Sequence, residues 1–484
     1  MKKITGIAAT GHEATALAAR EMLLAGGNAF DAALGAMLAA CVAEPVLASP
    51  GGGGFLTALP AQGEPMVYDF FPQTPKQRMP IETIDFYPIV ADFGTASQIF
   101  HIGMGSMATP GFVRGLFDIH RERCRLPMDL LMAPAKQLAV EGVVVNPFQD
   151  LIARIVAPIL KATPAALALH ASPGEPKRLI GVGERHCLPD LADFLSALEK
   201  EGAPLFYQGE VANRLIEDCR ELGGQLRRED LEEYRVIRRK PLIQRYRDAR
   251  LITNPPPSLG GPLIAFSLGL MANEKLTPKQ WGGENHLRHL ARVMRLTLDL
   301  RSDERIPMDQ ILSPEVAERY RKRLRLGGIS RRGTTQISIA DSEGNLASLT
   351  LSNGEGCGYV IPQTGTMMNN MLGEEDLNPG GFHNWPPNER LASMMAPSLL
   401  LRDGGDALVI GSGGSNRIRS AILQVISNLL DFDMPLDAAV SQPRIHFEGE
   451  LLSLEPEIAP EIARALLDEF PRQQSWREKS LFFG

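Results

Sequence analysis

The stretch Arg331-Arg332-Gly333-Thr334-Thr335-Gln336-Ile337-Ser338-Ile339-Ala340-Asp341 joins a basic, glycine-containing loop to an alternating segment. Polar and apolar residues alternate from Gln336 to Ala340, which predicts a strand with one buried face. Two threonines stand where the loop meets this strand. The arrangement suits self-cleavage, because the hydroxyl of Thr334 is able to attack the carbonyl carbon of Gly333, a residue with no side chain to hinder it.

Cleavage before Thr334 would release an α-amine with a pKa of roughly 8, low enough to act as base for the hydroxyl of the same residue. A threonine at a new N-terminus therefore carries nucleophile and base together. Threonine is also common in ordinary strands, so the Gly-Thr-Thr tripeptide by itself favours a plain strand start. A catalytic role has to be supported by the rest of the chain.

The N-terminal part of the chain predicts two alanine-rich helices. The first runs from His12 to Leu24 and ends before Gly26-Gly27-Asn28. Asp31 is expected to cap the second helix, Ala32 to Val42, which is apolar nearly all round and should be buried. The four glycines from Gly51 to Gly54 would let the backbone approach another group closely, or form a flexible turn. Further strands are expected at Phe55–Leu59, Met66–Phe70, Leu346–Leu351 and Leu399–Leu401.

A glycine-rich turn in the C-terminal half runs from Gly411 to Ile418 and precedes a helical pattern from Arg419 to Leu430. Glycine N–H groups at a helix start can form an anion site or an oxyanion hole. An ordinary strand-to-helix turn explains the same sequence equally well. Asn369-Asn370 and the segment from Asn388 to Ser393 place polar side chains in loops, where they either line a pocket or satisfy turns.

Composition excludes several classes of function. The chain has 484 residues, 44% hydrophobic content and a net charge of -7, with no basic footprint of the kind that nucleic-acid binders carry. No apolar run approaches the ~18 residues of a membrane span, and the N-terminus shows no signal-peptide pattern. The 5 cysteines are scattered without a CxxC pair, which predicts a reduced, cytoplasmic protein.

The histidines do not indicate a metal site. They are dispersed, and the nearest pair, His286 and His289, stands at i,i+3 in a predicted helix from His286 to Arg301 without an identifiable third ligand. An exposed helix face is the expectation for this pair. We therefore expect neither a metal nor another cofactor.

Many separate segments of the chain resemble the γ-glutamyltransferase family of N-terminal nucleophile hydrolases, in the order in which that family has them. The resemblance extends over the chain apart from its last residues. The matching segments are Gly26 to Ala33, Glu44-Pro45, Gly51 to Gly54, Thr109 to Gly111, Phe206 to Gly209, Asp230 to Tyr234, Pro255 to Gly261, Thr334-Thr335, Asp341 to Asn345, Asn369-Asn370, Leu391 to Met394, Gly413-Gly414 and Pro443 to His446.

The resemblance implies an α+β fold, a four-layer αββα sandwich made as a proenzyme (zymogen). Autocatalytic cleavage between Gly333 and Thr334 would give a large-subunit segment, 1–333, and a small-subunit segment, 334–484, which together form one composite domain. It further implies an amidohydrolase or acyltransferase that works on a small-molecule amide through a threonyl ester. The partners implied are the two subunits of the same precursor, with a homodimer of such heterodimers left open.

Site residues follow from the resemblance by position. Thr334 matches the nucleophile and base, and Gly413-Gly414 match the glycines whose amides form the oxyanion hole. Ser352 matches a second hydroxyl near the nucleophile. Asn353 matches an asparagine that contacts the glutamyl end of the substrate. Ser393 matches one serine of a paired-serine motif, in which Ala392 replaces the other.

Two positions depart from the family in the clamp that holds the substrate. Phe71 stands where the family has an arginine that grips the substrate α-carboxylate, and loss of such a charge-assisted contact costs about 1.5–3 kcal/mol. Glu374 stands where the family has an aspartate that holds the α-amine. The charge is kept on a longer arm. These changes favour an amide or N-acyl substrate whose acyl end is less charged than a γ-glutamyl group.

Two alternatives remain open at this point. The protein is a genuine γ-glutamyl hydrolase or transpeptidase of glutathione metabolism if another cation, such as Arg390 or Arg417, binds the carboxylate. It is an uncleaved, inactive homologue that binds a ligand or partner if the sheet lacks strands, an idea prompted by the chain ending at Leu481-Phe482-Phe483-Gly484, before the terminal strands of the family.

Overall fold

The computed structural model describes residues 5–92, 97–272, 274, 276–301, 312, 334–378, 380–479 and 481–483. The chain forms two compact units, each built from two parts of the sequence. The first comprises Met1–Arg239 and Gly333–Leu391, and the second comprises Lys240–Arg332 and Ala392–Gly484. This division concerns packing and does not test the predicted cleavage into 1–333 and 334–484, which stays a prediction.

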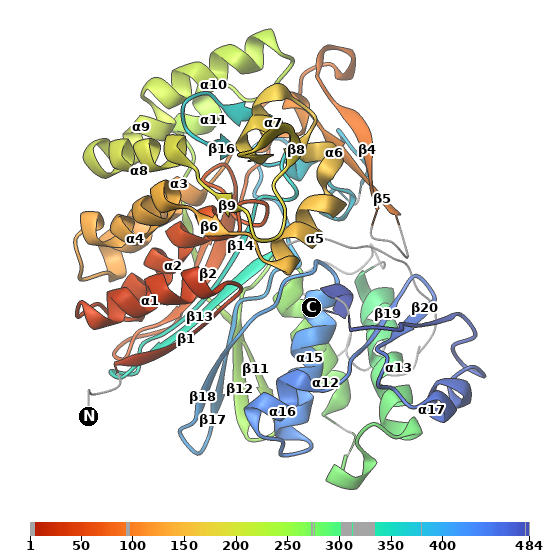
Figure 1. Ribbon diagram of the computed structural model, residues 1–484. Coiled ribbons are helices and arrows are strands. Elements are labelled where there is room, and N and C mark those ends of the chain that lie inside the picture. Colours follow the sequence, from red (N-terminus) through yellow and green to blue (C-terminus); the bar gives the residue numbers. More distant parts are fainter. Residues whose placement is uncertain are drawn as a thin grey trace. The chain divides into compact units, whose positions relative to one another are not determined.

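A six-stranded antiparallel sheet forms the centre of the first unit, with the strand order β1-β13-β14-β2-β3-β10. Figure 1 shows β1, from the start of the chain, beside β13, which follows more than 300 residues later. The strands are β1 (Gly6–Thr10), β13 (Thr335–Asp341), β14 (Leu346–Ser352), β2 (Gly53–Leu59), β3 (Met66–Phe70) and β10 (Ile237–Arg239).

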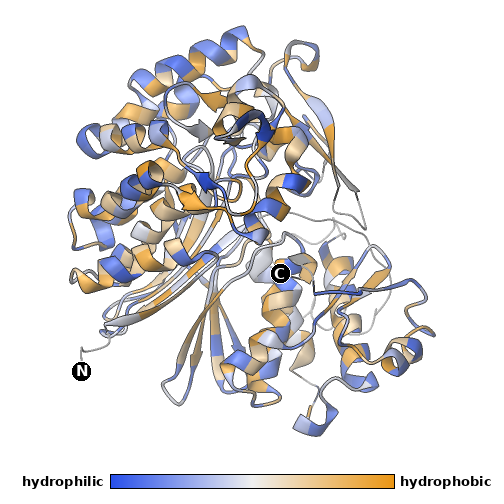
Figure 2. Ribbon diagram, viewed as in Figure 1, coloured by the Kyte–Doolittle hydropathy of each residue, from blue (hydrophilic) through white to orange (hydrophobic). Residues whose placement is uncertain are grey.

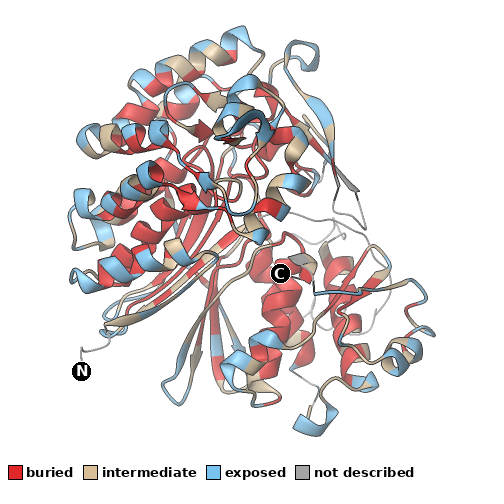
Figure 3. Cartoon of the chain, viewed as in Figure 1, coloured by how far each residue is buried: buried red, intermediate tan, exposed pale blue. Residues whose placement is uncertain are grey.

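Helix α2 (Ala29–Ala43) packs against β13 and β14 and is buried at all 15 of its residues, as the apolar sequence predicts (Figure 3). Its cap differs from the prediction. Asn28 is the N-cap, and Asp31 occupies the third helical position of a capping box with Asn28. The helix therefore begins three residues earlier than expected, because Asn28 and Asp31 cap its N-terminus jointly.

The other helices of the first unit pack around this core. The outer ones, such as α10, carry both hydrophobic and hydrophilic residues (Figure 2), as a helix with one buried face should. They are α1 (Glu13–Leu24), α3 (Phe112–Arg123), α4 (Met128–Glu141), α5 (Pro147–Ile155), α6 (Ala157–Leu160), α7 (Pro164–Leu169), α8 (Pro189–Glu201), α9 (Ala203–Tyr207), α10 (Glu210–Glu221) and α11 (Arg228–Glu232).

Four strand pairs lie outside the main sheet of the first unit. They are β4 (Tyr87–Asp92) with β5 (Ser97–Ile102), β6 (Val143–Val144) with β9 (Arg185–His186), β7 (Ala171–Ser172) with β8 (Glu175–Leu179), and β15 (Val360–Ile361) with β16 (Thr366–Met367).

The second unit contains a four-stranded antiparallel sheet in the order β11-β12-β17-β18. Its strands are β11 (Leu242–Tyr246), β12 (Ala249–Thr253), β17 (Ser398–Arg402) and β18 (Ala407–Ile410). Its helices are α12 (Gly260–Met271), α13 (Glu284–Arg301), α15 (Arg417–Leu430), α16 (Leu436–Ser441) and α17 (Pro460–Ala465). A three-stranded sheet completes the unit with β19 (Ile445–Glu448), β20 (Leu451–Leu454) and β21 (Gln473–Ser475).

Helices and largely antiparallel sheets together confirm the expected α+β class. The predicted strands at β2, β3, β13, β14 and β17 are present, with ends that differ by two residues at most. The predicted exposed helix face at His286 is wrong, because His286 is 2% exposed and its Nδ1 accepts a hydrogen bond from the backbone N–H of Gly282. Among the described helices, none is both long and apolar enough to cross a membrane.

Candidate active site

Thr334 lies at the end of the central sheet of the first unit, directly before β13. In the register of that sheet Thr335 pairs with Leu351, and Ser352 pairs with Gly53. Continuing the register places Thr334 beside Ser352, the predicted second hydroxyl. Thr334 is partly exposed, whereas Thr335 is buried. The predicted nucleophile therefore stands at a strand end, where a side chain can meet a substrate. Gly333, on the other side of the expected cleavage point, lies outside the described residues.

The glycine run beside this strand end serves close packing of backbones. A Cβ on Gly52 would lie 2.5 Å from the carbonyl oxygen of Ser352, and one on Gly54 would lie 2.4 Å from that of Thr350. Atoms do not approach so closely, so β14 can lie where it does only because these positions have no side chain. Of the two predicted roles for the run, close backbone approach is the one that the structure has.

Asn353 and Glu374, two predicted substrate-binding residues, are brought together in the first unit. A Cβ on Gly354 would lie 2.1 Å from Oε1 of Glu374, which puts this carboxylate next to the residue that follows Asn353. Asn353 is 1% exposed, its Nδ2 donates to the carbonyl of Met367 at 3.3 Å, and its Oδ1 has no protein donor among the described residues. A buried amide oxygen without a donor is costly, and the contact of Asn353 with a substrate stays a prediction.

Phe71 is packed inside the first unit. Its ring stacks on Phe55 with centroids 5.2 Å apart, and the residue is 1% exposed. Its carbonyl accepts hydrogen bonds from the Tyr234 hydroxyl at 2.7 Å and from Nη1 of Arg390 at 2.5 Å. At the position where the family that this chain resembles has an arginine, the side chain of Phe71 thus makes a hydrophobic contact. Its backbone carbonyl, and not its side chain, contacts a cation, the guanidinium of Arg390.

Arg390 is held by the protein itself. Besides Phe71, its guanidinium contacts the buried Asp69 carboxylate at 3.4 Å and the carbonyl of Arg235 at 2.6 Å, and it lies over the ring of Tyr234 at 4.5 Å. These contacts commit both terminal nitrogens of the guanidinium. They weaken the idea that Arg390 replaces the missing arginine for a substrate carboxylate.

The side chain of Asn369 hydrogen-bonds to backbone groups of neighbouring loops, so of the two roles predicted for it, lining a pocket or satisfying turns, it has the second. Its Nδ2 donates to the carbonyls of Gly51 and Ala108, and its Oδ1 accepts from the N–H groups of Ala108 and Met371. All these bonds join segments of the first unit. Asn369 therefore holds the glycine run in place and is not itself available to a ligand.

Gly413, Gly414 and Ser393 belong to the second unit. The two glycines lie between β18 and α15, and the carbonyl of Gly414 accepts the N–H of Arg417 at 3.1 Å in the turn that opens the helix. Gly414 has a φ of 104°, which favours glycine. Ser393 Oγ accepts from the N–H of Met395 at 3.1 Å, and its carbonyl accepts from the hydroxyl of Ser258 at 2.9 Å. Their catalytic and binding roles stay predictions.

Glu44 belongs to the Glu44-Pro45 segment of the family resemblance, and no functional role was predicted for it. It is the C-cap residue of α2, it is buried, and its Oε2 accepts a hydrogen bond of 2.6 Å from the hydroxyl of Thr335, the neighbour of Thr334. Burial raises the pKa of the Glu44 carboxyl to about 6, against a smaller lowering by the Thr335 hydrogen bond. The sequence did contain a signal for this residue, because a glutamate at the end of an otherwise apolar, buried helix is unusual and could have been noticed.

Metal binding finds no support in the part of the chain that the structure describes, which contains no group of three or more His, Cys, Asp or Glu side chains able to hold an ion.

Comparison with known proteins identifies the family. The sequence pattern of the family Gamma-glutamyltranspeptidase matches residues 15–482. This protein belongs to that family. The relationship confirms the resemblance and the expected class of enzyme, an N-terminal nucleophile hydrolase or acyltransferase of the γ-glutamyltransferase type.

Its similar relatives fall into two groups by name. The Acylase ACY 1 proenzyme of Pseudomonas sp. (strain V22) is 29% identical over 486 residues, covering 96% of this chain and 86% of the relative. The Glutathione hydrolase proenzyme of Pseudomonas aeruginosa is 29% identical over 478 residues, covering 92% and 83%. Equal identity to the two leaves the substrate undetermined.

Solved structures share the fold of this family member. The cephalosporin acylase from Bacillus halodurans superposes with a TM-score of 0.84 at 23% identity, covering 99% of this chain and 90% of that one. The Helicobacter pylori gamma-glutamyltranspeptidase chain gives a TM-score of 0.58 at 25% identity, covering 68% of this chain and 95% of its own.

Proposed function

We propose that this family member is an autoprocessed amidohydrolase or acyltransferase in which Thr334 is the nucleophile of both self-cleavage and turnover. The observation that carries the proposal is the place of Thr334, partly exposed at the end of β13 and beside Ser352 in the sheet register. The proenzyme names of the relatives support it. We also propose that the fold is of the four-layer αββα type, which the fold shared with the cephalosporin acylase supports.

Self-cleavage begins when the hydroxyl oxygen of Thr334 attacks the carbonyl carbon of Gly333. The C–N bond to Thr334 breaks, an ester forms, and the nitrogen takes up the proton as an amine. Water then hydrolyses the ester, giving a carboxylate on Gly333 and a free Thr334 with its hydroxyl restored. In turnover the freed α-amine accepts the hydroxyl proton while the oxygen attacks the carbonyl carbon of the substrate amide. The amide C–N bond then breaks, the proton passes to the leaving amine, and the acyl group stays on Thr334 as an ester until an acceptor takes it. We assign Gly413 and Gly414 to the oxyanion hole, which the glycine-lined turn before α15 supports.

The substrate that we propose is a small N-acyl compound whose acyl end lacks an α-carboxylate. Phe71 is packed on Phe55 where a carboxylate-binding arginine would otherwise stand, and Arg390 is engaged by Asp69, Phe71 and Arg235. We assign to the acyl end Asn353, whose Oδ1 has no protein donor among the described residues, and the neighbouring carboxylate of Glu374. The name of the acylase relative agrees with this class. Water or an amine would accept the acyl group.

A second candidate is γ-glutamyl transfer or hydrolysis, which the glutathione hydrolase relative favours. Glu374 keeps a negative charge for an α-amine, and the second unit contains Arg417 as a further cation. Comparing turnover of a γ-glutamyl anilide with that of anilides bearing neutral acyl groups separates the two candidates. A γ-glutamyl preference of tenfold or more in kcat/KM would reject our substrate class. Cytoplasmic location and the homodimer of heterodimers stay predictions beside either candidate.

The mechanism is tested by following maturation. Purified wild-type protein should resolve into two polypeptides by intact mass, and sequencing should find Thr334 at the start of the smaller one. Thr334→Ala should remain one chain, because no hydroxyl is left to attack Gly333. Thr334→Ser, which keeps the hydroxyl, is the matched control and should still cleave. A wild-type chain that stays whole and shows no amidase activity after prolonged incubation would point to the inactive homologue.

A further inference from the structure

A buried carboxylate holds the residue next to the nucleophile. Glu44 is 4% exposed at the C-cap of α2, and its Oε2 accepts a hydrogen bond of 2.6 Å from the hydroxyl of Thr335. That length lies in the range of hydrogen bonds to an ionised acceptor. Thr335 is the first residue of β13 and directly follows Thr334. The start of the nucleophile strand is thus tied to a helix that lies 291 positions earlier in the chain.

The second oxygen of the same carboxylate has no donor. Among the described residues, no protein group donates to Oε1 of Glu44, and this atom is buried. It faces Gly11, where a Cβ would lie only 2.4 Å away. A buried carboxylate oxygen without a donor costs free energy. The fold keeps Glu44 here despite that cost, which a residue serving stability alone would not explain.

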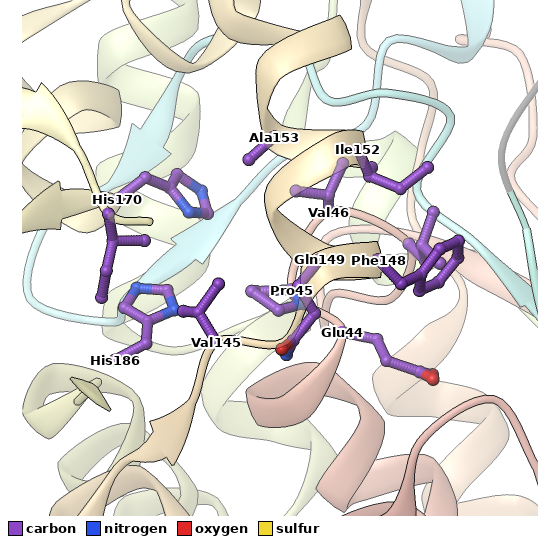
Figure 4. Close-up of a pocket in the computed structure, with 12 residues that line it drawn as sticks. Glu44, Pro45, Val46, Val145, Phe148, Gln149, Ile152, Ala153, His170 and His186 are labelled. Carbon is purple, nitrogen blue, oxygen red and sulfur yellow. The ribbon is translucent and has the colours of Figure 1, made fainter. Parts of the chain in front are cut away.

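Among the described residues around Glu44, the ionisable side chains next to it do not supply a compensating cation. Glu44 forms part of the wall of an open pocket whose other members include His170 and His186. Figure 4 shows the carboxylate directed away from both rings. Burial lowers the pKa of His170 to about 3 and also lowers the pKa of His186, so both rings are neutral near pH 7. The Cys41 thiol is likewise kept neutral, since burial and the Glu44 charge raise its pKa.

On the side of α1, the described residues next to Glu44 do not add a cation either. His12, the N-cap of that helix, has a pKa lowered by burial, and Glu13 follows it with a negative charge. Within the part of the chain that the structure describes, Thr335 is the side chain that hydrogen-bonds to the Glu44 carboxylate, and this contact is a directed hydrogen bond between a hydroxyl and a carboxylate.

Because of the geometry of β13, the hydrogen bond between Glu44 and Thr335 also affects the position of Thr334. Thr335, Ile337 and Ile339 form the buried face of β13 toward α2, and successive side chains alternate. The side chain of Thr334 then points to the opposite face. Fixing the Thr335 side chain fixes the backbone between the two threonines, which sets the direction of the Thr334 hydroxyl and the place of its nitrogen.

We propose that Glu44 is a positioning residue for the nucleophile, acting through Thr335. It orients the Gly333–Thr334 peptide for attack by the Thr334 hydroxyl before cleavage. After cleavage it keeps the new α-amine within reach of that hydroxyl. This proposal rests on the function proposed above and adds to it a group that touches neither substrate nor reacting atoms.

The test uses full-length protein with substitutions on both sides of the bond. Thr335→Val and Glu44→Leu remove it, Thr335→Ser keeps the hydroxyl, and Glu44→Gln keeps an oxygen acceptor without the charge. Thr10→Val, at the end of the neighbouring strand β1, is the matched control. The readouts are the rate of cleavage by intact mass, kcat and KM of the cleaved protein, and circular dichroism to confirm folding.

We expect Thr335→Val and Glu44→Leu to slow cleavage and to lower kcat roughly tenfold or more, the usual effect of losing a hydrogen bond to a charged group. KM should change less than twofold, because substrate is not contacted. Thr335→Ser should restore both rates to within about threefold, Glu44→Gln should fall between, and Thr10→Val should match wild type. The double variant Glu44→Leu/Thr335→Val should be no slower than either single one.

Two results would overturn the proposal in different ways. If wild type cleaves and the folded Thr335→Val and Glu44→Leu proteins cleave and turn over at its rate, Glu44 is structural only and the proposed function stands. If wild type never cleaves, the proposed function is wrong, and the inference about Glu44, which rests on that function, is wrong as well. Should Glu44→Leu not fold, the contrast between Thr335→Val and Thr335→Ser decides alone.

Discussion

Glu44 carries a carboxylate that the fold buries at the end of α2, and its titration should leave a trace on stability. Its pKa is about 6 in the folded protein, against the usual 4.5. Below pH 4.5 the group is protonated in both states. As pH rises from 4.5 to 6, the unfolded chain loses the proton first, so the free energy of unfolding should fall by about 2 kcal/mol.

Glu44→Gln should remove this part of the pH dependence and raise stability above pH 6 relative to wild type. Urea unfolding of the uncleaved Thr334→Ala background, measured at intervals from pH 4.5 to 7.5, tests this. Glu21→Gln, an exposed glutamate on α1, is the control and should follow the wild-type curve. Parallel curves for wild type and Glu44→Gln would show that the Glu44 carboxyl titrates at the same pH in the folded and unfolded chains.

Glu374 is the residue that we predict to bind an α-amine at the acyl end, and its buried carboxylate lies beside Gly354, next to Asn353. Glu374→Gln should raise KM about tenfold or more for an anilide whose acyl group carries a free α-amine, since a charge-assisted bond is lost. KM should stay within about twofold for the matched anilide without the amine. Equal effects on both substrates would argue against amine binding by Glu374.

At the scale of elements, the N-terminus of α2 connects several segments of the first unit. The carboxylate of Asp31 accepts hydrogen bonds from the N–H groups of Asn28, Arg125 and Leu126, at 2.8, 3.0 and 2.9 Å. The N–H of Ala29 is bound in turn by Asp341 at the end of β13. One helix start therefore fixes the loop after α3 and the far end of the nucleophile strand.

Asp31→Ala should lower the free energy of unfolding by about 3 kcal/mol or more, because three N–H groups lose a buried acceptor. Chemical denaturation with the linear extrapolation measures the change. Asp190→Ala, an exposed acidic residue in the first turn of α8, is the matched control and should cost no more than about 0.5 kcal/mol. A similar loss in both variants would mean that Asp31 acts only on the helix dipole.

Local sequence predicted the elements around the site well. Alternation located β13, a second strand was correctly expected at β14, and the apolar run predicted the burial of α2. The cap was misplaced, since Asn28 and Asp31 are both good capping residues and only packing shows that they act together. The pairing of β1 with β13 was missed, because five residues such as Gly6–Thr10 gain their strand character from a partner far along the chain.

At the scale of the molecule, family membership supplied what local patterns could not. It pointed to Thr334, Asn353 and Glu374, and the first unit does bring Asn353 and Glu374 together. The bond between Glu44 and Thr335 was beyond such reasoning, because it depends on how α2 and β13 pack. Likewise, the replacement at Phe71 was visible in the sequence, but the contacts that hold Arg390 beneath it were not.

The two polypeptides of the cleaved protein should stay together. β13 and β14 come from residues after the cleavage point, and their sheet neighbours β1 and β2 come from residues before it. Size-exclusion chromatography in native buffer should give one peak containing both polypeptides, which separate only in denaturant. Elution as two peaks without denaturant would contradict this sheet. Thr334→Ala should elute at the same volume as wild type.

The place of β13 also makes self-cleavage a checkpoint on folding. This strand is flanked by β1, from the first residues of the chain, and by β14, so Thr334 is held at its strand end only once the start of the chain has paired with a strand that follows more than 300 residues later. A chain that misfolds would keep its peptide bond and remain inert. The ratio of cleaved to uncleaved polypeptide in a cell would then report the fraction of molecules that have folded correctly. The nucleophile would become active only in chains whose sheet has formed.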